Sequence, residues 1–97
     1  MEQIDKRDRV IVISEENHGF IGVAKDLRHA INFLIEEDWI HEDEAFWDES
    51  QQKWLTLSQH MAMEMYEGTW QEYLHYKVQT DLMFFDGGFY FAEHIVY

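Results

Sequence analysis

The residues of this sequence with the most chemical potential are the carboxylates of a run at positions 36–49, EEDWIHEDEAFWDE. We call this run the acidic strip. It contains no Lys or Arg, and its acidic residues are Glu36, Glu37, Asp38, Glu42, Asp43, Glu44, Asp48 and Glu49. Its large aromatic residues, Trp39, Phe46 and Trp47, provide apolar surface that disordered acidic tails rarely have. We therefore expect an ordered negative surface that rings anchor to the core.

Metal chemistry or catalysis would need further residues in suitable positions. His60 and Glu64 are one helical turn apart, but a zinc site requires three or four ligands. Two looser combinations are His41 with Glu42 and Glu44, and Glu93 with His94. The chain has no Cys, no GxSxG nucleophile motif and no Gly-rich phosphate loop. We expect no catalytic residue, no metal and no cofactor, and a metal-dependent hydrolase is the remaining enzymatic alternative.

The charge of the chain is large and unevenly distributed. The net charge is −13. Residues 1–35 hold six acids and five bases, whereas residues 36–97 hold fourteen acids and only two bases, Lys53 and Lys77. DNA, RNA and anionic membranes attract basic patches, so direct binding to any of them is disfavoured. The charge instead predicts a basic protein partner, such as a nucleic-acid-binding protein.

Length and composition predict a single domain with a real core. The chain has 97 residues, of which 46% are hydrophobic, and its seven Phe, five Tyr and four Trp leave aromatic surface for an interface. The N-terminal segment MEQIDKRDR lacks the apolar region of a signal peptide. The longest apolar runs have four or five residues, too few for a membrane span. We expect a cytoplasmic protein.

Local patterns at the N-terminus predict a hairpin followed by a helix. Residues 9–14 are β-branched on both faces, as in a strand that is central or buried on two sides. A turn at 15–19 leads to a second strand at 20–23. Apolar residues at helical spacing then predict an amphipathic helix from about Asp26 to Asp38. Its last turn brings three carboxylates to the negative end of the helix dipole, and such a broken local rule points to function.

The middle of the chain has one ambiguous segment and two clear helix starts. Residues 45–57 form either two short strands or an irregular loop pinned by its tryptophans. Thr56 and Thr69 each begin a capping box. The first predicts a helix to about Tyr66 with Gly68 at its C′ position, and the second predicts a helix whose apolar stripe continues to Phe85.

The C-terminal segment 89–97, FYFAEHIVY, is rich in aromatic and β-branched residues and predicts a strand. A terminal strand is ordered only when paired, and the first hairpin is the nearest partner. The complete set of elements predicts an α+β domain. Its small antiparallel sheet, the N-terminal hairpin plus the C-terminal strand, would pack against about three helices.

The charge density of the acidic strip suggests what it could bind. Fourteen residues span about 20 Å as a helix or about 45 Å as a strand. The helical limit gives one charge per about 2.6 Å, which approaches the value of about 1.7 Å in duplex DNA. The strip could thus occupy a groove built for phosphates. Alternatively, it is a solvated face, as most charge runs are.

In size and charge the chain resembles small acidic inhibitors that phages and mobile elements encode against host DNA-handling machinery, including anti-restriction, anti-CRISPR and uracil-glycosylase inhibitor proteins. This resemblance is compositional and transfers no residue roles. It implies a nucleic-acid mimic that inhibits a basic host protein, and the charge of residues 36–97 predicts that the acidic strip is the binding surface. The alternative is a non-enzymatic interaction module, or a homodimer, that uses exposed aromatic residues such as Trp47, Trp54 and Tyr90.

Overall fold

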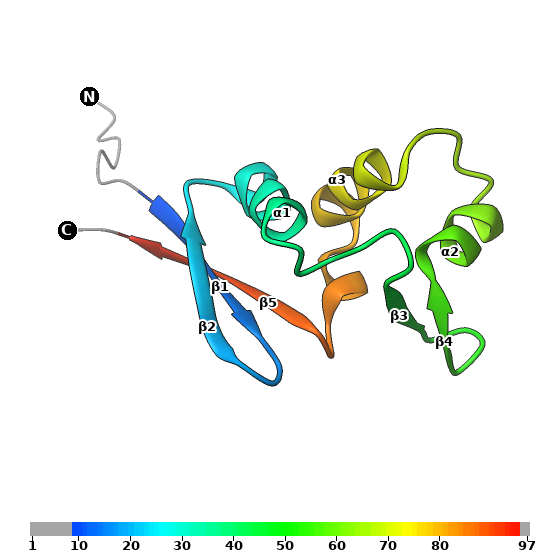
Figure 1. Cartoon of the computed structure of the whole chain (residues 1–97), viewed down its shortest axis with the longest axis horizontal. Helices are drawn as coiled ribbons and strands as arrows, with labels where there is room; N and C mark the ends of the chain where they lie inside the picture. The colour runs from blue at the N-terminus through cyan, green and yellow to red at the C-terminus, as the bar shows by residue number, and fades with distance from the viewer. Residues whose placement is uncertain (1–8, 96–97) are drawn as a thin grey trace, which may run out of the picture.

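The computed structural model of this chain describes residues 9–95 (Figure 1). In chain order its elements are β1 (Arg9–Glu15), β2 (Gly19–Ala24), α1 (Leu27–Glu36), β3 (Ala45–Asp48), β4 (Lys53–Thr56), α2 (Leu57–Met63), α3 (Trp70–Thr80), the 3₁₀ helix η1 (Leu82–Phe85) and β5 (Phe89–Ile95). The predicted α+β class, with three α-helices and a small antiparallel sheet, is confirmed. Two expectations fall on residues outside the described part of the chain: the lack of a signal peptide, on residues 1–8, and the end of the predicted strand 89–97, on residues 96–97.

The main sheet has the strand order β2-β1-β5, and both pairings are antiparallel. β5 pairs with β1 along its whole length, so the predicted pairing of the last strand with the first hairpin is correct. On one face, Ile11 and Ile13 are buried under α1. Gly22 allows this close packing, because a Cβ atom there would lie 2.6 Å from Cζ of Phe33. β1 is the central strand, one of the two positions that its composition indicated.

The ambiguous segment 45–57 contains a second hairpin, formed by β3 and β4. Phe46 lies opposite Leu55, and Trp47 lies opposite Trp54. Since side chains alternate along a strand, the first pair faces the core and the Trp pair faces solvent. The hairpin and the main sheet lie at opposite ends of the molecule (Figure 1).

Both predicted capping boxes are present, at Thr56 and Thr69. The predicted ends of these helices are wrong. α2 stops at Met63, and its left-handed C′ position belongs to Met65, with a φ of 54°, rather than to Gly68.

No helix within residues 9–95 is long and apolar enough to cross a membrane.

The predicted continuation of α3 to Phe85 is also wrong, because the helix stops at Thr80 and η1 follows. The break changes which side chains face inward. Leu82, expected in the apolar stripe, is exposed, whereas Phe84 and Phe85 are both buried. Phe84 stacks on Phe46 with a centroid separation of 4.6 Å, a contact between distant segments that helical periodicity could not show.

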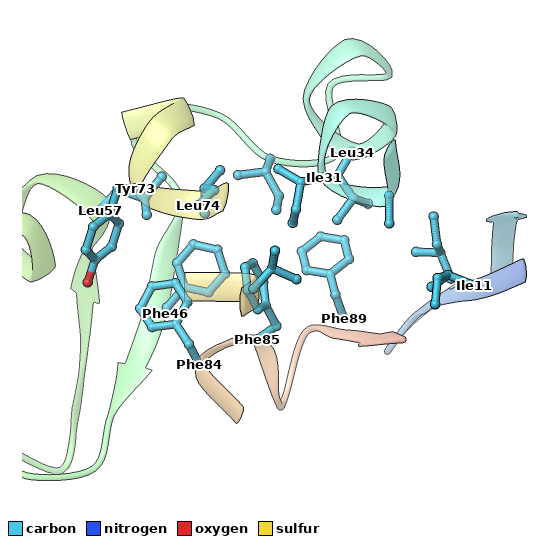
Figure 2. Packing of buried hydrophobic residues seen from close by; sticks show 14 residues of the cluster. Ile11, Ile31, Leu34, Phe46, Leu57, Tyr73, Leu74, Phe84, Phe85 and Phe89 are labelled. Carbon is cyan, nitrogen blue, oxygen red and sulfur yellow. The ribbon is translucent and has the colours of Figure 1, made fainter. Parts of the chain in front are cut away.

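One core connects the two ends of the molecule (Figure 2). Ile11 belongs to the main sheet, and Leu57 begins α2 beside the hairpin. Figure 2 shows the rings of Phe46, Phe84 and Phe85 together between them. This continuous packing fixes the ends of the acidic strip, which leads from α1 to the hairpin.

Candidate interaction surface

The acidic strip begins at the C-terminus of α1, where the backbone forms a Schellman motif. The N–H of Asp38 donates to the carbonyl of Ile35 (3.2 Å), and the N–H of Trp39 donates to that of Leu34 (2.8 Å). Asp38 takes the left-handed position, with a φ of 61°, that Gly usually occupies. These hydrogen bonds therefore fix the backbone that carries the first three carboxylates. At Asp38 this backbone has a conformation that is unfavourable for most residues other than Gly.

An aliphatic side chain anchors the middle of the strip. Ile40 is 1% exposed, and its N–H donates to the carbonyl of Leu34 (3.2 Å). Trp39, expected to anchor this segment, is only partly buried and packs against the core from its side. Its ring also contacts the imidazole of His18, with centroids 5.1 Å apart.

Glu42 and Asp43 are exposed in a short turn after Ile40. The N–H of Glu44 closes this turn by donating to the carbonyl of His41 (3.0 Å). The carbonyl of Glu44 in turn accepts from the N–H of Leu57 (3.0 Å), at the start of α2. These bonds tie the loop to the hairpin and α2, so its carboxylates project from an ordered backbone.

The strip ends in β3, where one ring is buried and one is not. Phe46 is buried, which confirms that a ring anchors the strip here. The expectation that Trp47 also anchors it is wrong, because alternation along β3 turns Trp47 outward. Trp47 is 37% exposed and Trp54 is 57% exposed, and the two rings form an edge-to-face pair with centroids 5.6 Å apart. The indole N–H of Trp47 donates to Oε2 of Glu49 (2.9 Å).

Asp48 orders the turn between β3 and β4. Its Oδ2 accepts from the hydroxyl of Ser50 (2.7 Å) and from the N–H of Gln51 (2.8 Å). The hydrogen bond from Ser50, followed by that from Gln51, lowers the pKa of Asp48 below its usual value, although desolvation opposes this shift. Asp48 is therefore a charged residue with a structural role in the strip.

None of the strip's eight carboxylates forms an ion pair in the described part of the chain. The ion pairs of that part are Arg9–Glu93, His18–Glu15, His29–Asp26, Lys77–Glu64 and Lys77–Asp81. Six of the eight acidic residues are exposed, and the other two, Glu44 and Asp48, are intermediate. The strip thus presents most of its charge to solvent without ion pairs, and the cation nearest to it in the hairpin is Lys53, opposite Asp48.

A groove of about 720 Å³ lies beside the end of the strip, between the hairpin turn, α2 and η1. Its apolar lining includes Trp47, Met63, Met83 and Phe84. Its carboxylates are Asp48, Glu49, Glu64, Asp81 and Asp86. A groove that combines apolar side chains with carboxylates is suited to Lys or Arg side chains, whose methylene stems bind apolar surface while their charged ends bind carboxylates.

Lys77 is the cation of the groove. It is 8% exposed, and its Nζ lies 3.0 Å from Glu64, 3.6 Å from Asp81 and 5.2 Å from the centroid of the Phe84 ring. The hydroxyl of Tyr73 also donates to Glu64. Burial, followed by this bond to Glu64, raises the pKa of Tyr73 well above its usual value. Desolvation opposes the ionisation of Glu64, but the bonds from Tyr73 and Lys77 keep its pKa below its usual value.

His60 and Glu64 do not form the metal site considered above. His60 is buried, and its Nε2 donates to the carbonyl of Phe46 (2.9 Å), while Glu64 binds Tyr73 and Lys77. No group of three or more His, Asp or Glu side chains within residues 9–95 is arranged to hold a metal ion. The two candidate ligands instead support the core and the groove.

The structure brings Trp47, Asp48 and Glu49 together with groove residues that the sequence did not single out. Lys77, Asp81 and Met83 come from α3 and the segment after it, far along the chain from the strip. One local signal was available: Lys77 lies between Leu74 and Val78 on the apolar side of α3, where a Lys needs a partner.

Comparison of the chain with models of protein families, with curated proteins and with solved structures gives no match. The fold and the surface therefore supply the evidence on function. They define a small α+β protein whose conspicuous surface feature is an ordered run of carboxylates without ion pairs next to exposed tryptophans.

Proposed function

We propose that this protein is an inhibitor that binds the basic nucleic-acid-binding site of another protein and places the acidic strip where phosphates would lie. The observation that carries the proposal is the strip itself. Its eight carboxylates follow an ordered backbone, and none of them forms an ion pair within residues 9–95. By the compositional resemblance, the target is a DNA- or RNA-handling protein of a host cell, as for phage anti-restriction or anti-CRISPR proteins.

The course of the strip supports this mode of binding. It combines the end of a helix, a loop and a short strand, and it crosses from α1 to the hairpin (Figure 1). Its span therefore cannot exceed the extended limit of about 45 Å. A partner that binds these carboxylates uses the Lys and Arg side chains that otherwise bind phosphates, so inhibitor and nucleic acid exclude each other.

The position of the first three carboxylates also favours a function in binding. Glu36, Glu37 and Asp38 stand at the negative end of the α1 dipole, and no basic residue lies in the last turn. Each such charge destabilises a helix by about 0.3–1 kcal/mol. Residues that lower stability at a fixed, exposed site are expected where a binding surface requires them.

The exposed Trp47–Trp54 pair supports a second candidate, an interaction module in which aromatic contacts dominate. Trp is enriched among the residues that contribute most to protein interfaces. In that case Trp47→Ala or Trp54→Ala would abolish binding, and salt would change the affinity little. The two candidates therefore differ in how binding responds to ionic strength.

The test begins with capture of the partner from lysate with and without nuclease, followed by binding measurements with the purified partner. Affinity should fall steeply with salt, and labelled duplex DNA or RNA should compete with the inhibitor. Glu42→Lys with Asp43→Lys should weaken binding by about tenfold or more. An affinity that is unchanged from low to high salt would contradict the proposal.

A matched control separates the position of these charges from the total charge. Glu16→Lys with Glu67→Lys changes the net charge equally, and both residues are exposed and lie outside the strip. This control should retain most of the affinity. If both double variants lose affinity equally, only the overall charge matters and the strip is not a specific binding surface.

A further inference from the structure

The main sheet has a second face that is apolar and uncovered within residues 9–95. Side chains of β1 point alternately to the two faces of the sheet, so Val10 and Val12 lie on the face away from the buried Ile11 and Ile13. Register extends this outer face to the neighbouring strands. Val12 is opposite Val23 and Ala92, and Ser14 is opposite Phe20 and Tyr90. We call the apolar members of this surface the outer sheet face: Val10, Val12, Phe20, Val23, Tyr90 and Ala92.

The exposure of these side chains conflicts with the usual pattern of an antiparallel sheet, in which the solvent face is polar. Phe20 is 65% exposed, Val23 is 51% exposed and Tyr90 is 44% exposed. α1 lies along the other side of the sheet, and no helix or strand of residues 9–95 covers this side (Figure 1). The sequence of β1 predicted burial on both faces or a central position, and in the described part of the chain only one face is covered.

The outer sheet face also lacks charge, unlike the rest of the molecule. In the cross-strand pairs that form this face, the residues besides the six apolar ones are Ser14 and His94. These pairs therefore contain no Asp, Glu, Lys or Arg. This is unusual in a chain with 20 acidic residues and a net charge of −13. A basic partner finds no carboxylate here, so the surface serves a different purpose from the acidic strip.

We propose that the outer sheet face binds a second copy of this chain, forming a dimer in which two sheets pack face to face. Two copies that each carry a charge of −13 repel each other wherever carboxylates meet, and this face removes them from the contact. An apolar face around a two-fold axis is complementary to itself. Packed sheets of this kind lie about 10 Å apart with their strands within about 30° of each other.

The area of the face shows which class of interface the dimer belongs to. Three strands about 4.8 Å apart and about 23 Å long cover roughly 300 Å² on each copy. This is well below the roughly 800 Å² per partner of a standard interface. A contact of this size is typical of weak, reversible association, so the dimer should form only at high protein concentration.

The salt dependence of this dimer is opposite in sign to that of the proposed inhibitor complex. Salt screens the repulsion between two acidic copies and leaves their apolar contact intact, so dimerisation strengthens as salt rises. Raising NaCl from about 0.02 M to about 0.5 M should lower the dimer Kd about fivefold or more. The proposal does not depend on the inhibitor function, and either can fail without the other.

Sedimentation velocity over a concentration series, repeated at low and high salt, tests the proposal. The wild-type chain should move from monomer to dimer, and Phe20→Glu with Val23→Glu should remain a monomer because it introduces facing carboxylates. Met65→Glu with Met83→Glu adds the same charge at exposed apolar residues elsewhere and should dimerise with a Kd close to that of the wild type. The circular dichroism and thermal unfolding of each variant show whether it is folded.

Nuclear magnetic resonance of the wild-type chain makes the test independent of the variants. The methyl signals of Val12, Val23 and Ala92 should shift with concentration, while those of buried Leu74 should not. A wild-type chain that is monomeric at every concentration and salt would overturn the proposal. It would also be overturned by a dimer that salt weakens, or by shifts that map to the Trp47–Trp54 pair.

Discussion

Neutralising the three carboxylates at the end of α1 should make the isolated protein more stable and make it a weaker binder. The variant Glu36→Gln, Glu37→Gln, Asp38→Asn keeps the size of each side chain and the helix propensity of the two Gln positions. Asn also tolerates the left-handed conformation that position 38 requires. The substitution thus removes charge with little other change.

The expected gain follows from the geometry of the helix end. All three residues are exposed, and the last turn of α1 has no basic residue to offset them. Taking the lower end of the usual range for each exposed charge gives a total of about 1 kcal/mol. For a domain of this size, that corresponds to a rise in Tm of about 4–8 °C.

Urea and thermal unfolding at low salt measure this gain, and two controls isolate its cause. Glu16→Gln, Glu42→Gln, Glu67→Gln removes the same net charge at exposed residues outside helices, so it reports general relief of repulsion and should give a smaller gain. Glu72→Gln removes a carboxylate from the first turn of α3, where the dipole favours it, and should lower stability. The gain of the triple variant should shrink in about 1 M salt.

The reasoning would be refuted if the triple variant at α1 were no more stable than the wild type, or only as stable as the charge-matched control. Either result would mean that these carboxylates do not destabilise α1, so their position would no longer argue for a role in binding. A gain in stability together with weaker partner binding is the expected combination.

Two other predictions concern single residues. Asp48→Asn should lower the free energy of unfolding at neutral pH, as measured by urea unfolding. The pKa of Asp48 is lower in the folded state than in the unfolded state, so its charge stabilises the fold above the unfolded-state pKa of about 4, and this contribution is lost as the carboxylate is protonated at lower pH. The difference between variant and wild type should therefore disappear as pH falls below about 4, and a difference independent of pH would contradict this. Met65→Gly should raise the free energy of unfolding by about 0.5–1 kcal/mol, since Met65 is 85% exposed and has a φ of 54° that Gly adopts without strain; a loss of stability would show that the Met65 side chain contributes more than it strains.

The parts of the fold that could be predicted are those with local signals. The capping boxes at Thr56 and Thr69 depend on residues three positions apart, and both are present. Asp26 begins α1 as its position indicated, with its side chain accepting from the N–H of His29. The C-terminal strand was predictable because β composition and its terminal location left one economical partner, β1.

The parts that could not be predicted depend on contacts between distant segments. α3 stops at Thr80, and Phe84 in the following 3₁₀ helix stacks on Phe46 in the hairpin, a contact that helical periodicity cannot indicate. The anchor of the acidic strip is Ile40, whose burial depends on how the loop leaves α1. The groove was missed because Lys77 and Glu64 belong to different helical segments, and their ion pair exists only after packing.

The departures from local rules in this protein gather on two surfaces. On the acidic strip and its hairpin, carboxylates oppose a helix dipole, Asp38 and Gln52 take left-handed conformations, and a Trp pair faces solvent. On the outer sheet face, apolar residues occupy positions that solvent usually assigns to polar ones. Met65, with its left-handed backbone, and the buried Lys77 are departures outside both surfaces. Because natural sequences are otherwise locally consistent, such clusters are expected where a surface has been kept for binding. The two clusters differ in chemistry, one charged and one neutral, so they are suited to different partners, and the opposite effects of salt on the two contacts follow from that difference.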